Sequence, residues 1–177
     1  MSIVCSPDGA ASLATPFAVA TARVRPEWID RNGHMNVGFY HVVFDRAAVP
    51  FFDWLGLTQA FRDEYGGSTF ALETHLGFLR ECREGVELRF EARLLAFDRK
   101  RLHFYQEMFR VEDGERAATY ECLSSYVDMR TRRTAPMPQT LSARLAQVLD
   151  AHRALARPWQ IGHRIGTPPG IDTGTGG

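Results

Sequence analysis

The stretch that decides the fold is VGFYHVVFDRAAVPFFDWL, residues 37–55, between Asn36 and Gly56. Asn36 suits the start of a helix, because its side-chain oxygen can accept a hydrogen bond from a free first-turn N–H. Glycine suits the position after the last turn. Apolar side chains cover most of the predicted helix, and the exceptions form a thin polar stripe: His41, Asp45, Arg46 and Asp53. A helix that is apolar nearly all round is buried, so we expect it at the centre of the molecule.

Beyond this helix the hydrophobic period changes to two. In 86–97, apolar residues alternate with charged ones: Glu87, Arg89, Glu91 and Arg93. This alternation is typical of a strand with one core face and one wet face. Further strands are expected at 68–81, 102–111 and 116–129, joined by turns such as Asp113-Gly114. Together they predict a four-stranded antiparallel meander, preceded by an edge strand within 17–28 and a short helix over 58–65.

Pro136 and Pro138 end the strand region, and helical spacing returns in a set of apolar residues and one histidine: Leu141, Leu145, Val148, Leu149, His152 and Leu155. We expect a C-terminal amphipathic helix there. The first 15 residues have no periodicity and are expected to form a loose arm. The last residues are rich in Gly, Pro and Thr, so 158–177 are expected to form a flexible tail. Between them, 16–157 form one predicted domain of the α+β class.

The composition limits the function classes. The chain has 177 residues, 21 basic and 21 acidic, so the formal net charge is zero. A nucleic-acid-binding protein usually carries a basic excess, and we expect no such partner. Twenty of the basic residues are Arg and only Lys100 is lysine, with no phosphate-binding GxxxxGK[ST] motif around it. The sequence has no signal-peptide pattern and no apolar run long enough for a membrane span, which favours a cytoplasmic protein without membrane contact.

Three cysteines, Cys5, Cys82 and Cys122, are widely spaced and form no CxxC pair. Neither a disulfide framework nor a cysteine zinc site is expected, and no other residues have metal-ligand spacing. There is also no GxGxxG motif and no GxSxG motif, which excludes dinucleotide oxidoreductases and α/β-hydrolases. We expect neither a metal nor a cofactor.

The segment WIDRNGHMNVGFY, 28–40, carries a more specific pattern. It resembles the D-x-D-x-x-G-H-x-N-N-x-x-Y pattern of hotdog-fold acyl-CoA thioesterases, in the 4-hydroxybenzoyl-CoA thioesterase-like branch. The matching positions are Asp30, Gly33, His34, Asn36 and Tyr40, whereas Trp28 and Val37 depart from the pattern. The segments 72–81, 97–109 and 131–138 also look like this branch, so the resemblance covers about 16–156. It implies a long antiparallel sheet wrapped around a central helix, and an acyl-CoA substrate. Some similar proteins act on betainyl-CoA.

The chemistry of this loop agrees with a thioesterase. A helix N-terminus offers unpaired N–H groups and a positive dipole end to a developing oxyanion. Gly33 lets a backbone amide approach closely, because it has no Cβ. Asp30 is six residues before the helix cap. The resemblance implies that it acts as nucleophile or as general base toward water, and the residues do not decide between the two. His34 and Asn36 could orient Asp30 or the water.

Other readings of these residues stay open. A loop rich in Asp, Asn and Gly before a helix is most often only a cap and a turn. Tyr40 is expected in the core, with its hydroxyl toward the substrate pocket. Glu73 and His75 share one face of a predicted strand, where they either line a pocket or make exposed charge pairs. Glu73 is the second candidate for the catalytic carboxylate.

Two basic clusters could hold the phosphates of coenzyme A, since Arg is well matched to phosphate. One is Arg99-Lys100-Arg101, which we interpret as solvated turn charges. The other consists of Arg130, Arg132 and Arg133, which remain candidates for substrate binding.

Two alternatives to a thioesterase remain. One is a non-catalytic acyl-CoA-binding protein of the same fold, and the other is a hotdog hydratase or dehydratase, although no D-x-N-P-x-H-type segment is present. A sheet with an uncovered outer face and edge invites a second copy. We therefore expect a homodimer, or a dimer of dimers, with sites at the subunit boundary.

Overall fold

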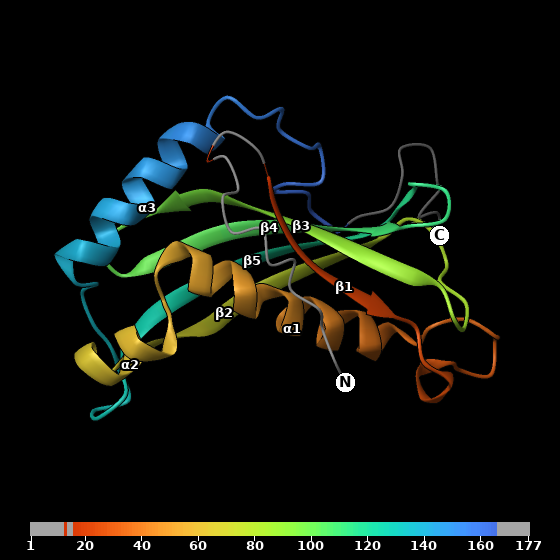
Figure 1. Ribbon diagram of the computed structural model, residues 1–177, viewed down its shortest axis with the longest axis horizontal. Coiled ribbons are helices and arrows are strands. Elements are labelled where there is room, and N and C mark those ends of the chain that lie inside the picture. Colours follow the sequence, from red (N-terminus) through yellow and green to blue (C-terminus); the bar gives the residue numbers. More distant parts are fainter. Residues whose placement is uncertain (1–12, 14–15, 166–177) are drawn as a thin grey trace, which may run out of the picture.

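Helix α1, Val37–Leu55, lies against one face of an antiparallel sheet (Figure 1). The computed structural model describes Leu13 and residues 16–165. The expected cap is confirmed, because the Asn36 side-chain oxygen accepts a hydrogen bond from the Gly38 N–H at 2.9 Å. Gly56 ends the helix in the left-handed region, at φ 103°. That backbone conformation costs glycine little and other residues more.

The remaining elements follow the expected periodicities closely. In chain order they are β1 Phe17–Arg23, the 3-10 turn η1 Pro26–Trp28, α1, α2 Gln59–Tyr65, β2 Gly67–Phe78, β3 Glu87–Phe97, β4 Arg101–Arg110, β5 Arg116–Asp128, β6 Arg133–Thr134 and α3 Gln139–His152. The α+β class, the central helix and the C-terminal helix are confirmed. Strand β6 has two residues and was not expected, because so short a segment carries no periodicity.

The strand order corrects the expected four-stranded meander. The order is β1-β3-β4-β5-β2, with β6 beside the end of β5. Only β3, β4 and β5 form a meander. β2 pairs with β5 at the far edge, and β1 pairs with β3 at the other edge, where an edge strand was expected. The reason is that residues 79–86, here called the crossover segment, pass from one edge toward the other instead of forming a hairpin.

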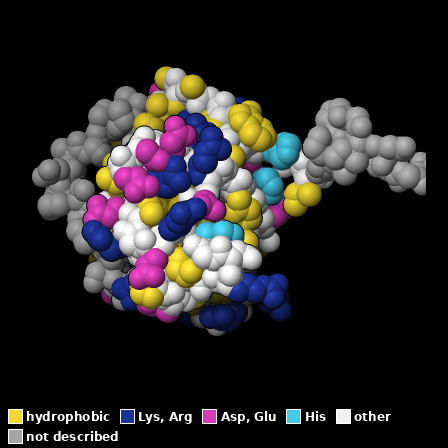
Figure 2. Space-filling model, turned by 90° about the vertical axis from the view of Figure 1, so that its right-hand side faces the viewer, with side chains coloured by type: hydrophobic (Ala, Val, Ile, Leu, Met, Phe, Trp, Pro, Cys, Tyr) yellow, Lys and Arg dark blue, Asp and Glu magenta, His cyan; other side chains and the backbone are white. Residues whose placement is uncertain are grey.

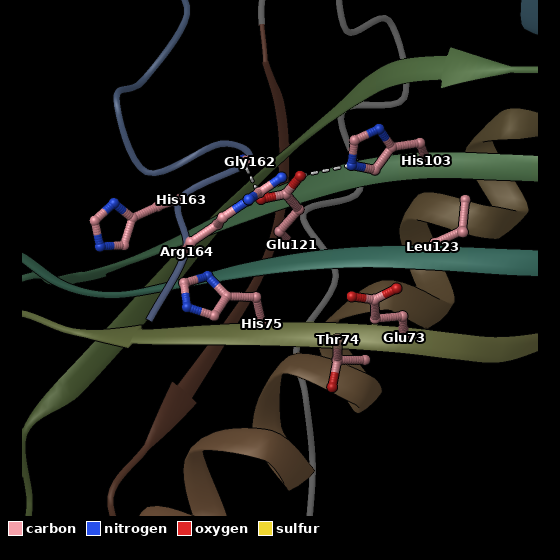
Figure 3. Close-up of a pocket in the computed structure, with 9 residues that line it drawn as sticks. All are labelled: Glu73, Thr74, His75, His103, Glu121, Leu123, Gly162, His163 and Arg164. Carbon is pink, nitrogen blue, oxygen red and sulfur yellow. Dashed lines mark hydrogen bonds and ion pairs between the residues drawn. The ribbon is translucent and has the colours of Figure 1, made fainter. Parts of the chain in front are cut away.

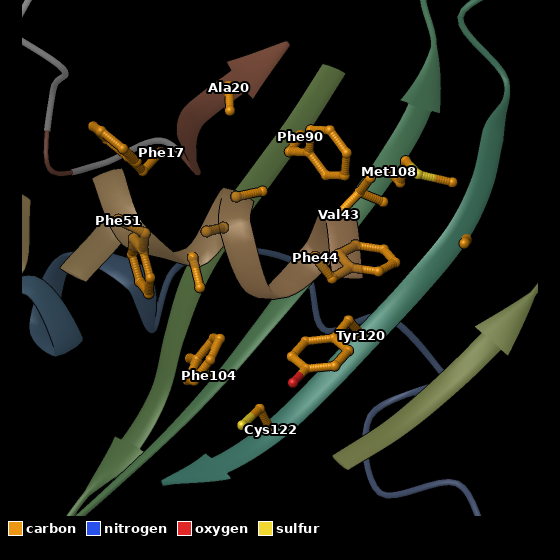
Figure 4. Packing of buried hydrophobic residues seen from close by; sticks show 14 of the residues in the cluster. Phe17, Ala20, Val43, Phe44, Phe51, Phe90, Phe104, Met108, Tyr120 and Cys122 are labelled. Carbon is orange, nitrogen blue, oxygen red and sulfur yellow. The ribbon is translucent and has the colours of Figure 1, made fainter. Parts of the chain in front are cut away.

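The core lies between α1 and the face of the sheet that it covers (Figure 4). Phe44 stacks on Tyr120 with ring centroids 5.3 Å apart, and Phe51 packs on Phe104 at 6.0 Å. Burial of each such aromatic side chain contributes about 1.5–3 kcal/mol to the gross stability. The helix is nevertheless not enclosed on all sides. Two valines that were expected to be buried, Val42 and Val49, are exposed at 36% and 50%, and Val37 in the first turn is exposed at 62%.

The opposite, outer face of the sheet carries a buried ion network. Glu107 is 4% exposed. Its carboxylate pairs with Arg93 at 2.9 Å and with Arg116 at 3.1 Å. Alternation along β3 and β4 directs Arg93 and Glu107 away from α1, and a register irregularity between Ala118 and Arg116 places Arg116 on the same face. A buried carboxylate between two guanidinium groups is satisfied only while both partners remain.

Residues 153–165, here called the C-terminal segment, return over this outer face (Figure 1). Arg93 Nη1 donates to the carbonyl of Ala156 at 2.8 Å, and Gln160 and Ile161 are buried. The flexible tail expected from 158 onward is therefore wrong for 158–165, because the polar residues of β3–β5 supply partners that local composition does not reveal. Residues 166–177 lie outside the described part of the chain. So does most of the expected N-terminal arm, except Leu13, which packs on the core.

Candidate active site

The loop 29–36, here called the Asp30 loop, is a tight turn between η1 and α1. Its two ends are joined by a bridge between Ile29 and Met35. The Asp30 N–H donates to the carbonyl of His34, and the Gly33 N–H donates to the carbonyl of Asp30, both at 3.0 Å. Gly33 has φ 81° and open space beside its Cα. The turn therefore needs glycine here for its backbone conformation, and it leaves room on that side.

Asp30 and His34 lie on the same side of this loop. One carboxylate oxygen of Asp30 accepts a hydrogen bond from the Asn32 N–H at 2.8 Å. The same oxygen is 3.9 Å from His34 Nδ1, which is longer than a hydrogen bond. The two side chains are 20% and 35% exposed, so water reaches both. The loop thus presents an accessible carboxylate with an imidazole next to it.

The first amides of α1 differ in what they bind. Asn36 uses its side-chain oxygen for the Gly38 N–H and its carbonyl for the Phe39 N–H, both at 2.9 Å. Within the described residues, the Val37 N–H donates to no acceptor. It stands at the positive end of a 19-residue helix, and Val37 is 62% exposed. An unpaired amide at such a position is suited to bind an oxyanion.

Figure 2 looks at the end of the molecule that is on the right in Figure 1, where α1 begins. Acidic and basic side chains are interspersed there, and no broad region of a single charge covers this end. The positive end of the helix dipole at the Val37 amide is therefore not set within a broad surface of one charge.

The Tyr40 side chain is buried, at 4% exposure, and its hydroxyl is 3.5 Å from the carbonyl of Arg80. Its ring meets Phe78 edge-on at 5.1 Å. Burial is the main cause that raises the pKa of Tyr40, so the hydroxyl stays protonated. In this structure the hydroxyl faces the carbonyl of Arg80, and the expected contact with substrate stays a prediction. Helix periodicity turns the side chain toward the crossover segment instead.

Glu73 and His75 lie elsewhere, on the outer face of the sheet (Figure 3). His75 is opposite Glu121 in the register, whereas the neighbouring Tyr120 and Cys122 belong to the core around α1. Because side chains alternate along a strand, Glu73 and His75 point away from α1. The structure does not bring them to the Asp30 loop within one chain.

Glu73 and His75 line a hollow of about 380 Å³, here called the outer-face hollow, between β2 and the C-terminal segment. Its other ionisable residues are His103, Glu121, His163 and Arg164. Glu121 accepts from the Gly162 N–H and pairs with His103 Nε2, each at 2.7 Å. Sequence reasoning missed His103 and Glu121, although their alternating positions in β4 and β5 place them on the polar face.

The two basic clusters have different surroundings. Arg130, at 86% side-chain exposure, pairs with Asp128 at 3.3 Å, and this contact is the main cause that lowers the pKa of Asp128. Arg132 lies over the ring of Phe70, with its guanidinium carbon 5.0 Å from the centroid. Arg133 is an exposed residue of β6. None of the three lines the outer-face hollow.

The first cluster, in contrast, lines a second hollow of about 450 Å³, here called the basic hollow. Its lining residues are Leu72, Asp98, Arg99, Lys100, Arg101, Ser125 and Thr134. Arg101 is paired with Asp98, whose pKa is lowered first by the Lys100 N–H and then by the Arg101 side chain. Arg99 and Lys100 have no ion-pair partner among the described residues.

No group of three or more His, Cys, Asp or Glu side chains in 16–165 has the arrangement of a metal site. No helix in the same part of the chain is long and apolar enough to cross a membrane.

Comparisons with known proteins place these features in a family. Residues 24–145 match the family model described as "Thioesterase-like superfamily". The betainyl-CoA thioesterase of Pseudomonas aeruginosa is 39% identical over 146 residues, covering 82% of this chain and 92% of that protein. The L-carnitine dehydrogenase/betainyl-CoA thioesterase of Rhizobium meliloti is 29% identical over 91% of this chain. This chain spans only 32% of that relative.

Among solved structures, the Staphylococcus aureus protein SAV2348, described in complex with CoA, has a TM-score of 0.78. It is 28% identical, and the match covers 87% of this chain and 98% of that chain. The matched family model includes the Asp30 loop, α1 and all of β2 to β5.

Proposed function

The chain belongs to the thioesterase-like superfamily, and on that premise we propose that it hydrolyses an acyl-CoA thioester at the Asp30 loop. The observation that carries the proposal is the pairing of an accessible carboxylate, Asp30, with the unpaired N–H of Val37 at the start of α1. The Asp30 carboxylate can act as nucleophile or general base, and the Val37 N–H can stabilise the negative charge that develops on the thioester oxygen. Both belong to the segment that carries the thioesterase motif.

In the proposed reaction, the thioester oxygen lies at the Val37 N–H and the acyl carbon lies near Asp30. Asp30 either attacks this carbon or removes a proton from a water that attacks it. Attack by the carboxylate forms an acyl–aspartyl anhydride and releases the CoA thiolate, and water then hydrolyses the anhydride. Attack by water gives the carboxylate product and CoA directly. His34 lies close enough to orient the water in either route.

For coenzyme A, we propose the basic hollow as the phosphate site in place of Arg130, Arg132 and Arg133. Arg99 and Lys100 supply two cations without ion-pair partners among the described residues, and Thr134 supplies a hydroxyl group that accepts a hydrogen bond from Ser125 at 3.0 Å. These groups match the charge and hydrogen-bonding needs of a phosphate. Arg130 pairs with Asp128, and Arg132 lies over the ring of Phe70, so both guanidinium groups already have partners.

Within one chain, the basic hollow and the Asp30 loop are at opposite ends of α1. The hollow includes the β3–β4 turn, whereas the Asp30 loop precedes the first turn of the helix. We propose that a second copy completes the site. β2 is an edge strand, and antiparallel pairing of two β2 strands would bring the partner's basic hollow to the end of β2 near Phe78. The exposure of Phe78, at 51%, and of Val37 supports an interface there.

The acyl group proposed first is betainyl, because both curated relatives described above carry that activity in their names. The test is a panel of betainyl-, short-chain, branched and aromatic acyl-CoA substrates, with released thiol trapped by a dye. Hydrolysis that disappears in Asp30→Asn at an unchanged melting temperature supports the proposed site. Full activity of Asp30→Asn contradicts it. Tight binding without hydrolysis of any substrate would favour the acyl-CoA-binding alternative.

A further inference from the structure

The crossover segment, 79–86, is fixed to the sheet at both ends. Its first two N–H groups donate to the carbonyl of Ala117, at 2.9 and 3.0 Å. Near its other end, the Gly85 N–H donates to the carbonyl of Val24 at 2.9 Å. The segment therefore bridges β5 on one side and the end of β1 on the other. It is held by backbone hydrogen bonds and gives the neighbouring Asp30 loop a fixed support.

Cys82 is the residue of this segment that contacts the Asp30 loop. Its carbonyl accepts a hydrogen bond from the Met35 N–H at 2.8 Å. Cys82 itself is 0% exposed, and Met35 is 1% exposed. The hydrogen bond lies between Asp30 and Asn36 in the sequence. A shift of Cys82 would therefore move the part of the loop that joins the carboxylate to the helix cap.

Tyr40 connects the same segment to the first turn of α1. Its hydroxyl is 3.5 Å from the carbonyl of Arg80, two residues before Cys82. The pKa of Tyr40 is raised mainly by burial and further by its interaction with Cys82. Burial likewise is the main cause that raises the pKa of Cys82, so both groups remain neutral. The crossover segment is thus in contact with both halves of the candidate site.

We propose that Tyr40 and Cys82 are positioning residues that set the geometry between the Asp30 carboxylate and the Val37 N–H. Neither side chain touches the reacting atoms in this scheme. Cys82 holds the loop that carries Asp30 through its main-chain carbonyl, which its buried side chain keeps in place, and Tyr40 holds the helix turn that carries the amide. A displacement of about 1 Å in such a pair can lower a rate about 100-fold. The inference rests on the proposed function.

The chain supplies a matched control in a second tyrosine–cysteine pair. Tyr120 and Cys122 are each 2% exposed, and they face α1 from β5. Their pKa values are also raised, with burial as the main cause. This pair resembles Tyr40 and Cys82 in residue type, burial and proximity, but it makes no recorded hydrogen bond to the Asp30 loop or to the crossover segment. A substitution that only disturbs packing should affect both pairs alike, whereas loss of positioning should lower kcat only for Tyr40 and Cys82.

The experiment compares Tyr40→Phe, Cys82→Ala and their double variant with Tyr120→Phe and Cys122→Ala. For each protein, kcat, KM and the melting temperature are measured, together with hydrogen exchange at the Met35 amide. We expect kcat to fall about 10- to 100-fold in the Tyr40 and Cys82 variants, with KM within about twofold. The two effects should be less than additive in the double variant, because they disturb one geometry. Cys82→Ser, which keeps the size of the side chain, should retain more kcat than Cys82→Ala.

Equal losses of kcat in the two pairs, or a loss carried by KM, would overturn the positioning role. If Tyr40→Phe does not fold, the comparison of Cys82→Ala with Cys82→Ser and Cys122→Ala decides alone. The proposed function fails separately, when the wild-type protein hydrolyses no substrate on the panel. In that case hydrogen exchange still tests the support of the loop. Unchanged exchange at Met35 in Cys82→Ala would overturn it without reference to activity.

Discussion

The Asp30 loop and the outer-face hollow are both polar regions of this molecule, and they differ in kind. The outer-face hollow has more ionisable groups, with two glutamates, three histidines and an arginine. The Asp30 loop has one carboxylate and one histidine close together. Only the loop adjoins an unpaired amide at the positive end of a long helix. The number of titratable side chains is therefore a poor guide to a thioesterase site, and the orientation of backbone amides is a better one.

The partners of the ionisable groups differ as well. In the outer-face hollow, Glu121 is engaged by His103 and by the Gly162 N–H, and these contacts hold the C-terminal segment on the sheet. In the loop, the Asp30 carboxylate accepts one backbone hydrogen bond and is otherwise accessible to water. The ionisable groups of the outer-face hollow therefore hold two parts of the same chain together. The Asp30 loop leaves its reactive group available.

The largest expected effect comes from Asp30→Asn. Loss of the carboxylate should lower kcat/KM about 100- to 10,000-fold, the range for removal of a general acid–base group. The melting temperature should stay near that of the wild type, because asparagine can still accept the turn hydrogen bond. The matched change in the other region is Glu121→Gln, for which kcat/KM should stay within about twofold. A greater loss from Glu121→Gln than from Asp30→Asn would reverse the assignment of the two regions.

The next effect concerns stability on the outer face. Glu107→Ala leaves Arg93 and Arg116 without their buried partner and should cost about 3–5 kcal/mol. Glu91 pairs with Arg89 on the same face but is more exposed, so Glu91→Ala should cost at most about 1 kcal/mol. Denaturant unfolding measures the free energy of unfolding of both variants. Similar costs for the two variants would show that burial of the network contributes nothing.

A smaller effect separates capping from catalysis. Asn36→Ala and Thr58→Ala each remove a helix cap, of α1 and α2, and each should cost about 1 kcal/mol. Only Asn36→Ala should also lower kcat, by about tenfold, because it loosens the turn that presents the Val37 amide. Unfolding free energies and initial rates test this pair. A kcat loss in Thr58→Ala as large as that in Asn36→Ala would indicate a general effect of lower stability.

The smallest effect concerns stability in acid, and it comes from Asp128, a residue outside both regions. The Arg130 side chain is the main cause that holds the pKa of Asp128 below its usual value of about 3.9. The contribution is present above that value and is lost as the pH falls through the lower, folded-state pKa. Asp128→Asn should therefore be less stable than the wild type at neutral pH, with the difference vanishing in acid. Melting curves across this range would contradict the prediction if the difference grew toward low pH.

Much of the fold could be predicted because its elements have strong local patterns. The alternation in β3 and the capped apolar stretch of α1 are examples, since each is decided by neighbours in the sequence. The place of β2 could not be predicted, because the crossover segment contains Gly85 and resembles a hairpin turn. Its path depends on contacts with Val24 and Ala117, which are distant in sequence.

The candidate site likewise has residues that the sequence places correctly and residues that it cannot place. Asp30, Gly33, His34 and Asn36 belong to one short motif, and the structure places them in one turn at the start of α1. Glu73 and His75 could not be assigned to a face without the register of β2 on β5. The exposed Val42 and Val49 were expected to be buried because a single sequence does not distinguish a side chain covered by its own chain from one left for a partner.

The single lysine of the chain allows the basic hollow to be labelled selectively. Apart from the α-amino group of the chain, Lys100 is the only primary amine, and it lines that hollow. An amine-reactive reagent should therefore label this protein at one side chain, a property that a mixture of lysines and arginines would not provide. Mass spectrometry of the labelled protein, with and without CoA, would then report occupancy of the hollow directly. Because every other basic residue is an arginine, a label on Lys100 reports selectively on this hollow.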